Sequence, residues 1–224
     1  MEYRIIRSKR KSISIQISKE AEVLVRVPID IHKSVIDEFV NSNEKWILEK
    51  LIMMRGINYE KSRFVLDYGH KVLFRGKEFT LTETDKNAII FHQDLLYIPS
   101  GLSRDQIKYL LIKMYNHQAK NIISFKVNFY SKIMNVTPKA LKINSASTRW
   151  GSCSGKKSLN FSWKIIFAKD EIIDYLVVHE LAHIKQLNHS EKFWDEVKKV
   201  IPDYNNRRKE LTELGIKLRN QNWD

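Results

Sequence analysis

Hydrophobic and polar residues alternate in two segments near the start of the chain. Residues 12–18 read SISIQIS and residues 22–27 read EVLVRV, with the turn-prone stretch SKEA between them. A period of two is typical of strands with one buried face, so these segments predict a β-hairpin. From Asp30, which can serve as an N-cap, apolar residues recur every three or four positions instead. That spacing predicts a helix or a pair of helices over residues 31–54.

Short apolar runs return over residues 64–98 (FVLDY, KVLF, EFTLTE, AIIF and LLYIP), separated by glycines and an aspartate, and indicate further strands. Ser103 then provides a cap for a long helix. Beyond it, the runs ALKIN, TRWGSC and SLNFSW again indicate short strands. Residues 170–220 carry helical spacing that is interrupted at Asn188 and at Pro202.

These patterns predict an α+β fold in two parts. A β-rich N-terminal region, residues 1–100, carries one helical segment, and residues 101–224 form a second region with long helices and a small sheet. The 43% hydrophobic content is enough for a substantial core. The charged start does not match a signal peptide, and no apolar run is long enough to span a membrane. With a single cysteine, Cys153, the chain fits a soluble cytoplasmic protein without membrane contact.

Positive charge is concentrated in one part of the chain. The formal net charge is +13, and residues 106–169 contain no Asp or Glu at all. A block of one sign attracts phosphate backbones, anionic surfaces or acidic substrates. This region is therefore a candidate nucleic-acid contact. A lysine-rich solubilising surface is an equally good explanation.

A metal-binding pattern lies in the helical segment that follows residue 170, where His179, Glu180 and His183 form His-Glu-x-x-His. Residues four apart on a helix share one face, so both imidazoles can reach one ion. Zinc accepts neutral imidazole, and in catalytic sites it keeps one position open for water, whose pKa it lowers. Glu180 lies about 100° around the helix from His179, where it can take a proton from that water as general base.

The surrounding helix favours a functional interpretation of this pattern. Its residues are apolar nearly all round, and two histidines and a glutamate in such a helix are costly unless something satisfies them. A bound metal ion does so. Hydrogen bonds from both histidines to neighbouring carbonyls are the structural alternative.

The third ligand has to come from another part of the chain, and His189 is our candidate. Asn188 tolerates the left-handed conformation that ends a helix, and such a turn would bring His189 back toward the metal. The spacing from His183 to His189 matches the metzincin pattern, but Gln186 stands where metzincins have glycine. The competing candidates are acidic residues farther along the chain: Glu191, Asp195, Glu196 and Asp203.

At these positions the chain resembles the YgjP-like metallopeptidase-domain family, which is related to the SprT and Spartan group of proteases. Three blocks carry the resemblance in the family's order: residues 149–153 (RWGSC), residues 179–183 (HELAH), and residues 188–190 (NHS) followed by Phe193 and Trp194. The resemblance implies a minimal zincin-type core in residues 101–224 and metal-dependent peptide hydrolysis. It also supports His189 as the third ligand.

The first of these blocks precedes the active-site helix. In zincins, a strand beside that helix commonly binds extended substrate by edge pairing, which makes Arg149 and Trp150 candidate substrate-binding residues. An alternative is that Trp150 anchors the core while Gly151 makes a turn. Cys153 is either an ordinary buried thiol or a fourth metal ligand that would silence the site.

The leading hypothesis is a cytoplasmic zinc metallopeptidase of the HExxH type, with proteins associated with nucleic acid among its substrates. Arg149 and Tyr204 are candidates for stabilising the transition state. One alternative is a nucleic-acid-binding protein with a structural or vestigial zinc site. Against it, structural zinc sites are usually closed by four cysteine-rich ligands. Another alternative is a metal-dependent hydrolase of small amides, for which a closed pocket would be expected.

Overall fold

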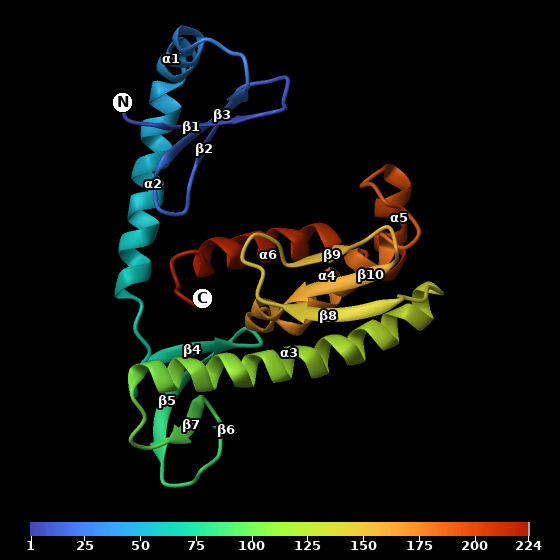
Figure 1. Ribbon diagram of the computed structural model, residues 1–224. Coiled ribbons are helices and arrows are strands. Elements are labelled where there is room, and N and C mark those ends of the chain that lie inside the picture. Colours follow the sequence, from blue (N-terminus) through green and yellow to red (C-terminus); the bar gives the residue numbers. More distant parts are fainter. Residues whose placement is uncertain (224) are drawn as a thin grey trace. The chain divides into compact units, whose positions relative to one another are not determined.

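The computed structural model describes residues 1–223, which form two compact units (Figure 1). The first unit contains Met1–Phe64 together with Arg219–Asn222. The second contains Val65–Leu218 together with Trp223. Strands and helices occur in both, which confirms the predicted α+β class.

The first unit contains a three-stranded sheet and two helices. Strands β1 (Arg4–Ser8), β2 (Ser14–Ile17) and β3 (Val23–Pro28) are ordered β1-β3-β2, with β1 parallel and β2 antiparallel to β3. The predicted hairpin is therefore confirmed. Helices α1 (Lys33–Ser42) and α2 (Glu44–Arg63) follow as a pair, as the spacing allowed.

Alternation along β3 explains the core of this unit. Val23, Val25 and Val27 are buried, and they belong to one cluster with residues such as Ile36 and Val40 of α1. The start of α1 differs from the prediction, because His32 rather than Asp30 is the N-cap. Its side chain accepts a hydrogen bond from the Ser34 amide, which satisfies an otherwise unpaired donor at the helix end.

The second unit begins with a four-stranded sheet. Its strands are β4 (Lys71–Phe74), β5 (Lys77–Thr84), β6 (Ile90–His92) and β7 (Leu95–Pro99), ordered β4-β5-β7-β6. Only the β5–β7 pair is parallel. The FVLDY run at residues 64–68 forms no strand, because local bonds compete: the Asp67 amide donates to His70 and the Tyr68 amide donates to Asp67.

The longest helix, α3 (Arg104–Met134), begins where the sequence predicted. The Gln106 amide donates to the Ser103 hydroxyl, and the Ser103 amide donates back to the Gln106 side chain, so the helix starts with a capping box. The helix ends at Asn135, whose backbone is left-handed.

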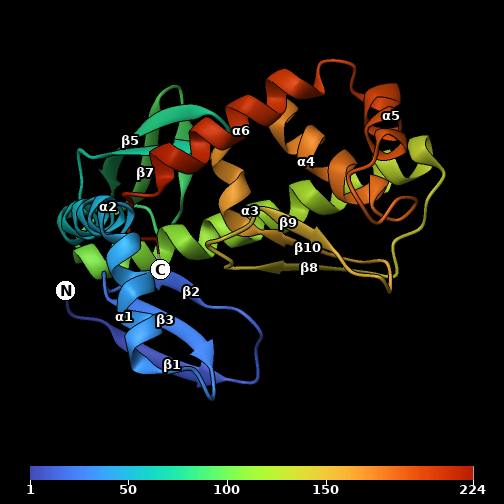
Figure 2. The same cartoon turned by 90° about the horizontal axis from the view of Figure 1, so that it is seen from above.

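A second sheet and the remaining helices complete this unit. Strands β8 (Ala140–Asn144), β9 (Gly151–Cys153) and β10 (Ser158–Ser162) are ordered β8-β10-β9, so β9 is an edge strand. The 3-10 helix η1 (Trp163–Phe167) leads into α4 (Asp170–Ala182), α5 (Glu191–Val200) and α6 (Tyr204–Leu218). Helix α4 contacts α3, α5, α6 and β9, and therefore lies at the centre of this unit (Figure 2).

The turn between β4 and β5 is tied to the start of α4. The amides of Arg75 and Gly76 donate to the carbonyls of Ile166 and Phe167, and the Arg75 guanidinium pairs with Asp170. These bonds place the four-stranded sheet in the same unit as α4. The compact units divide after Phe64. That residues 101–224 form the functional core stays a prediction.

Aromatic packing fixes the segment that leads into α4. Tyr115 of α3 stacks on Trp163 at 5.9 Å between ring centroids and meets Phe167 edge-on at 5.0 Å. Trp223 packs 5.2 Å from Phe167 on the same cluster. All four side chains are buried. Among residues 1–223, no helix is long and apolar enough to cross a membrane.

Candidate metal centre

Helix α4 presents the two histidines of the predicted motif on one face. It ends at Ala182, and His183 is its C-cap but keeps right-handed helical backbone angles. His183 therefore still lies one turn beyond His179, and the two ring centroids are 5.1 Å apart.

The chain reverses after His183, but by a different turn from the one predicted. Asn188 is not among the residues of 1–223 with positive φ, so the expected left-handed turn at Asn188 was wrong. Instead, the regular hydrogen bonding of the helix ends just after Ala182, whose carbonyl accepts from the amides of both Lys185 and Gln186. His183 Nδ1 closes this turn by donating to the Gln186 carbonyl at 3.1 Å.

This turn brings His189 to the other two histidines. Its Nε2 lies 3.1 Å from His179 Nε2, and one ligand atom from each of the three histidines falls within 4.8 Å of the others. Two nitrogens on a tetrahedral zinc ion are about 3.3 Å apart when each bond is about 2.05 Å. The His179–His189 separation is close to this value, and the three imidazoles converge as the ligands of one metal ion would.

The second ring nitrogens have partners that suit metal ligands. His183 Nδ1 must carry its proton, because a carbonyl only accepts, and Nε2 keeps its lone pair. His179 Nδ1 lies 3.5 Å from the Tyr175 hydroxyl, one turn earlier on α4. Partners of this kind orient ligating histidines in metal sites. Tyr175 was not among the predicted site residues, although its spacing of four residues from His179 was a usable signal.

Aromatic side chains from α5 surround the three imidazoles. Phe193 lies between 4.5 and 4.9 Å from all three histidine rings. Trp194 stacks on His189 at 5.6 Å and on Tyr204 at 5.1 Å. Ser190 is the N-cap of α5, and its carbonyl accepts from the Phe193 and Trp194 amides. Phe193 and Trp194 of the Phe-Trp block thus pack against the imidazoles of the site.

Burial keeps the first two imidazoles neutral. The pKa of His179 is lowered to about 3, mainly by burial and further by His183, His189 and Arg208. Burial also lowers the pKa of His183. Neutral imidazole is the form that binds metals, so these ligands need not lose a proton near neutral pH.

Glu180 is buried beside the three histidines and against β9. Its side chain is 4% exposed, and its Oε2 has no hydrogen-bond partner among residues 1–223. Burial raises the pKa of this carboxyl to about 8. A Cβ atom at Gly151 would lie 2.6 Å from Glu180 Oε1, so the glycine of the RWGSC block makes room for the carboxylate.

The buried carboxyl predicts how the metal-free protein responds to pH. The relevant window runs from pH 6.5, the ordinary pKa of histidine, to about 8, the raised pKa of folded Glu180. Within this window Glu180 is protonated in the folded protein and ionised in the unfolded chain. The free energy of unfolding should therefore fall as pH rises through this window, by about 2 kcal/mol at most. Urea unfolding of chelated protein would measure it. The decline should be absent in Glu180→Gln, and an equal decline in that variant would contradict the assignment.

The alternative ligands are not part of the three-histidine group. Glu196 pairs with Lys185 and Lys199, and Asp203 pairs with Arg207. Cys153 is partly buried, and its pKa is raised by burial and by the negative charge of Glu180.

A hollow of about 280 Å³ opens over the histidines and Glu180. Its walls include Arg149, the three residues of β9, and Leu187, which is 74% exposed. Trp150 is not part of this lining. Its indole packs instead against Gly215 of α6, where a Cβ atom would lie 3.6 Å from Trp150 Cζ2. The structure therefore brings Arg149 to the site and gives Trp150 a packing contact.

A family model for the YgjP-like metallopeptidase domain matches residues 11–214, nearly the whole chain. The chain belongs to this family. The YgjP-like family is one of metallopeptidases, which accounts in general terms for a catalytic metal and for protein or peptide substrates. No curated protein matches the chain.

Two archaeal proteins are among the solved structures similar to this YgjP-like chain. The metallopeptidase zymogen abylysin of Pyrococcus abyssi is 22% identical, with a TM-score of 0.39 over 44% of this chain and 97% of its own. The metallopeptidase zymogen jannalysin of Methanocaldococcus jannaschii is 23% identical, with a TM-score of 0.37 over 41% of this chain and 94% of its own.

Proposed function

We propose that this metallopeptidase hydrolyses peptide bonds with one zinc ion held by His179, His183 and His189, and with Glu180 as general base. The observation that supports this proposal is the convergence of three imidazole nitrogens beside a buried carboxyl at the floor of one hollow. Three protein ligands leave a coordination position for water, as catalytic zinc requires and structural zinc does not.

When bound, zinc would supply a Lewis acid that polarises the scissile carbonyl and lowers the pKa of a water molecule. Glu180 takes the proton from that water and can return it to the leaving amine. Its burial suits this role, because a carboxyl with a raised pKa is a stronger base than one in solvent. Tyr175 and the Gln186 carbonyl hold the imidazoles in the orientation that ligation needs.

The edge strand β9 supports a peptide as substrate rather than a small amide. Within residues 1–223, β9 pairs only with β10, and its residues line the hollow beside Glu180. An extended peptide can add to such an edge through main-chain hydrogen bonds, which positions its carbonyl near the three histidines. Arg149, exposed two residues before this strand, is the candidate for a contact with the incoming chain.

The direct test is incubation of the zinc-loaded protein with an unfolded protein substrate, followed by mass spectrometry of the products. We expect cleavage that stops when zinc is chelated and returns when about one equivalent is added back. Failure to cleave any of several unfolded substrates while one zinc ion is bound per chain would contradict the proposal.

The close approach of Gly151 and Glu180 gives a sharper prediction. Gly151→Ala places a methyl group within 2.6 Å of Glu180 Oε1, so the carboxylate must shift. A general base displaced by about 1 Å costs on the order of 100-fold in kcat/KM. Gly155→Ala is the matched control, because its added Cβ meets nothing within 4 Å. Equal activity of the two variants, measured at full zinc content, would show that Glu180 is not held by this contact.

Association with nucleic acid stays a prediction. Part of the positive charge of residues 106–169 is neutralised from outside that region: Lys126 pairs with Asp174 of α4, and Lys169 pairs with Glu210 of α6. The remaining surface lysines fit a solubilising role equally well.

A further inference from the structure

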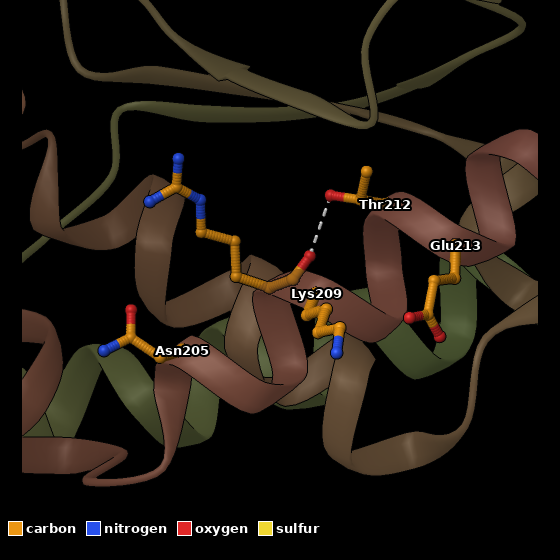
Figure 3. Close-up of a pocket in the computed structure, with 5 residues that line it drawn as sticks. Asn205, Lys209, Thr212 and Glu213 are labelled. Carbon is orange, nitrogen blue, oxygen red and sulfur yellow. Dashed lines mark hydrogen bonds between the residues drawn. The ribbon is translucent and has the colours of Figure 1, made fainter.

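A second hollow, of about 450 Å³, lies on α6 (Figure 3). The residues that line it recur every three or four positions, so they occupy one face of the helix. They are Asn205, Arg208, Lys209, Thr212 and Glu213. None of them is a proposed metal ligand or takes part in the proposed reaction.

Contacts at its two ends connect this hollow to the active site. At one end the Arg208 guanidinium lies 5.2 Å above the ring of Trp194, the residue that stacks on His189. Just past the other end, Gly215 packs against Trp150, which immediately precedes β9. Arg208 therefore links this hollow to Trp194, a side chain that packs on the metal centre.

Among residues 1–223, Arg208 is an exposed cation without an acidic partner. No carboxylate of residues 1–223 lies within ion-pair distance of its guanidinium, whereas the adjacent Arg207 is paired with Asp203. The Thr212 hydroxyl donates to the Arg208 carbonyl at 3.0 Å, and the Trp194 ring supports the guanidinium from below. Stacking of this kind leaves the N–H edges of the guanidinium available for a carboxylate.

The other charges of the hollow are arranged unevenly. Lys209 adds a second positive charge next to Arg208, and Glu213, the acidic residue of the lining, lies one turn farther along α6. The end that faces Trp194 and His189 is therefore positive. A carboxylate would be attracted to that end and repelled from the other.

We propose that Arg208 forms an anion-binding subsite that takes a carboxylate of the peptide substrate within about three residues of the scissile bond. This proposal rests on the proposed function and names its substrate class. An extended chain advances about 3.3 Å per residue, so a peptide over the three histidines can reach past Trp194 to the guanidinium. The carboxylate can come from an acidic side chain or from the peptide's own C-terminus.

Peptide kinetics would test this inference. We would compare quenched fluorescent peptides that differ only by Glu or Gln at each position flanking the cleaved bond, each with a free or amidated C-terminus. The native protein should prefer one carboxylate-bearing peptide about tenfold in kcat/KM. A preference for Glu over Gln identifies an acidic side chain as the source of the carboxylate, and a preference for the free over the amidated C-terminus identifies the chain end. Added salt should weaken the preference.

Three variants separate a subsite from a structural role. Arg208→Gln should abolish the preference, and Arg208→Glu should invert it toward a lysine-bearing peptide. Lys86→Gln, on the turn between β5 and β6, removes one positive charge elsewhere and should keep the preference. No preference in the native protein, or an equal loss on both peptides in Arg208→Gln, would overturn the inference.

A binding measurement keeps the inference separate from the proposed function. Fluorescence anisotropy of labelled Glu and Gln peptides with zinc-loaded Glu180→Gln protein should show about tenfold tighter binding of the carboxylate-bearing peptide. Arg208→Gln in the same background should remove that difference. Cleavage without any binding difference would sustain the peptidase and reject the subsite. A binding difference without cleavage by native protein would support the subsite and reject the peptidase activity.

Discussion

Glu180→Gln is expected to lower kcat for peptide hydrolysis by about three orders of magnitude while the protein still binds zinc. Glutamine has nearly the same shape as the carboxyl, so the packing against Gly151 is retained. It cannot accept a proton from water, and so the reaction loses its general base. Metal content by atomic emission and initial rates on a fluorescent peptide would measure both parts of the prediction.

The matched control for this experiment is Glu191→Gln. Glu191 is exposed in the first turn of α5 and lies outside the three-histidine group. This variant makes the same chemical change and should keep native rates. Activity near native levels in Glu180→Gln would remove Glu180 from the role of base, and loss of zinc in that variant would assign it to metal binding instead.

His183→Ala should abolish both stoichiometric zinc binding and peptide hydrolysis. The substitution removes one of the three convergent nitrogens, and two imidazoles bind zinc far more weakly than three. Zinc should therefore no longer raise the melting temperature, since only ligands bound to the folded state stabilise it. Thermal unfolding with and without zinc, together with metal analysis after dialysis, would measure this.

Another histidine provides the comparison for this variant. His92, exposed at the end of β6, is not part of the group. His92→Ala should retain the zinc-dependent rise in melting temperature and full activity. If His183→Ala still held one zinc ion per chain after dialysis, the metal would have to lie elsewhere.

The strongest periodic signals of the sequence were sufficient for much of the fold. The alternation around β2 and β3 and the Ser103 cap both appear in the structure as predicted, because each depends on local geometry. His179 and His183 share a helix face for the same reason. Local spacing therefore placed two of the three histidines.

Features that depend on tertiary contacts could not be predicted from the sequence. His189 was predicted as the third ligand from the wrong turn, because the chain reversal is closed by His183 and Gln186 and not by a left-handed Asn188. The division after Phe64 depends on bonds from the β4–β5 turn to residues about ninety positions away. Gly151 was interpreted only as a turn, since nothing in the sequence shows that Glu180 packs against it.

Strand β9 is only three residues long, from Gly151 to Cys153, and so offers about 10 Å of backbone for pairing. So short a template cannot pull a segment out of a stable fold. As the proposed substrate-binding edge, it would capture only chain that is already extended. Substrate selectivity would then depend on the conformational state of the target protein. Native proteins expose extended segments only when they unfold locally, and therefore only for a small fraction of the time. An enzyme built this way would discriminate damaged or unfinished proteins from intact ones without reading much of their sequence.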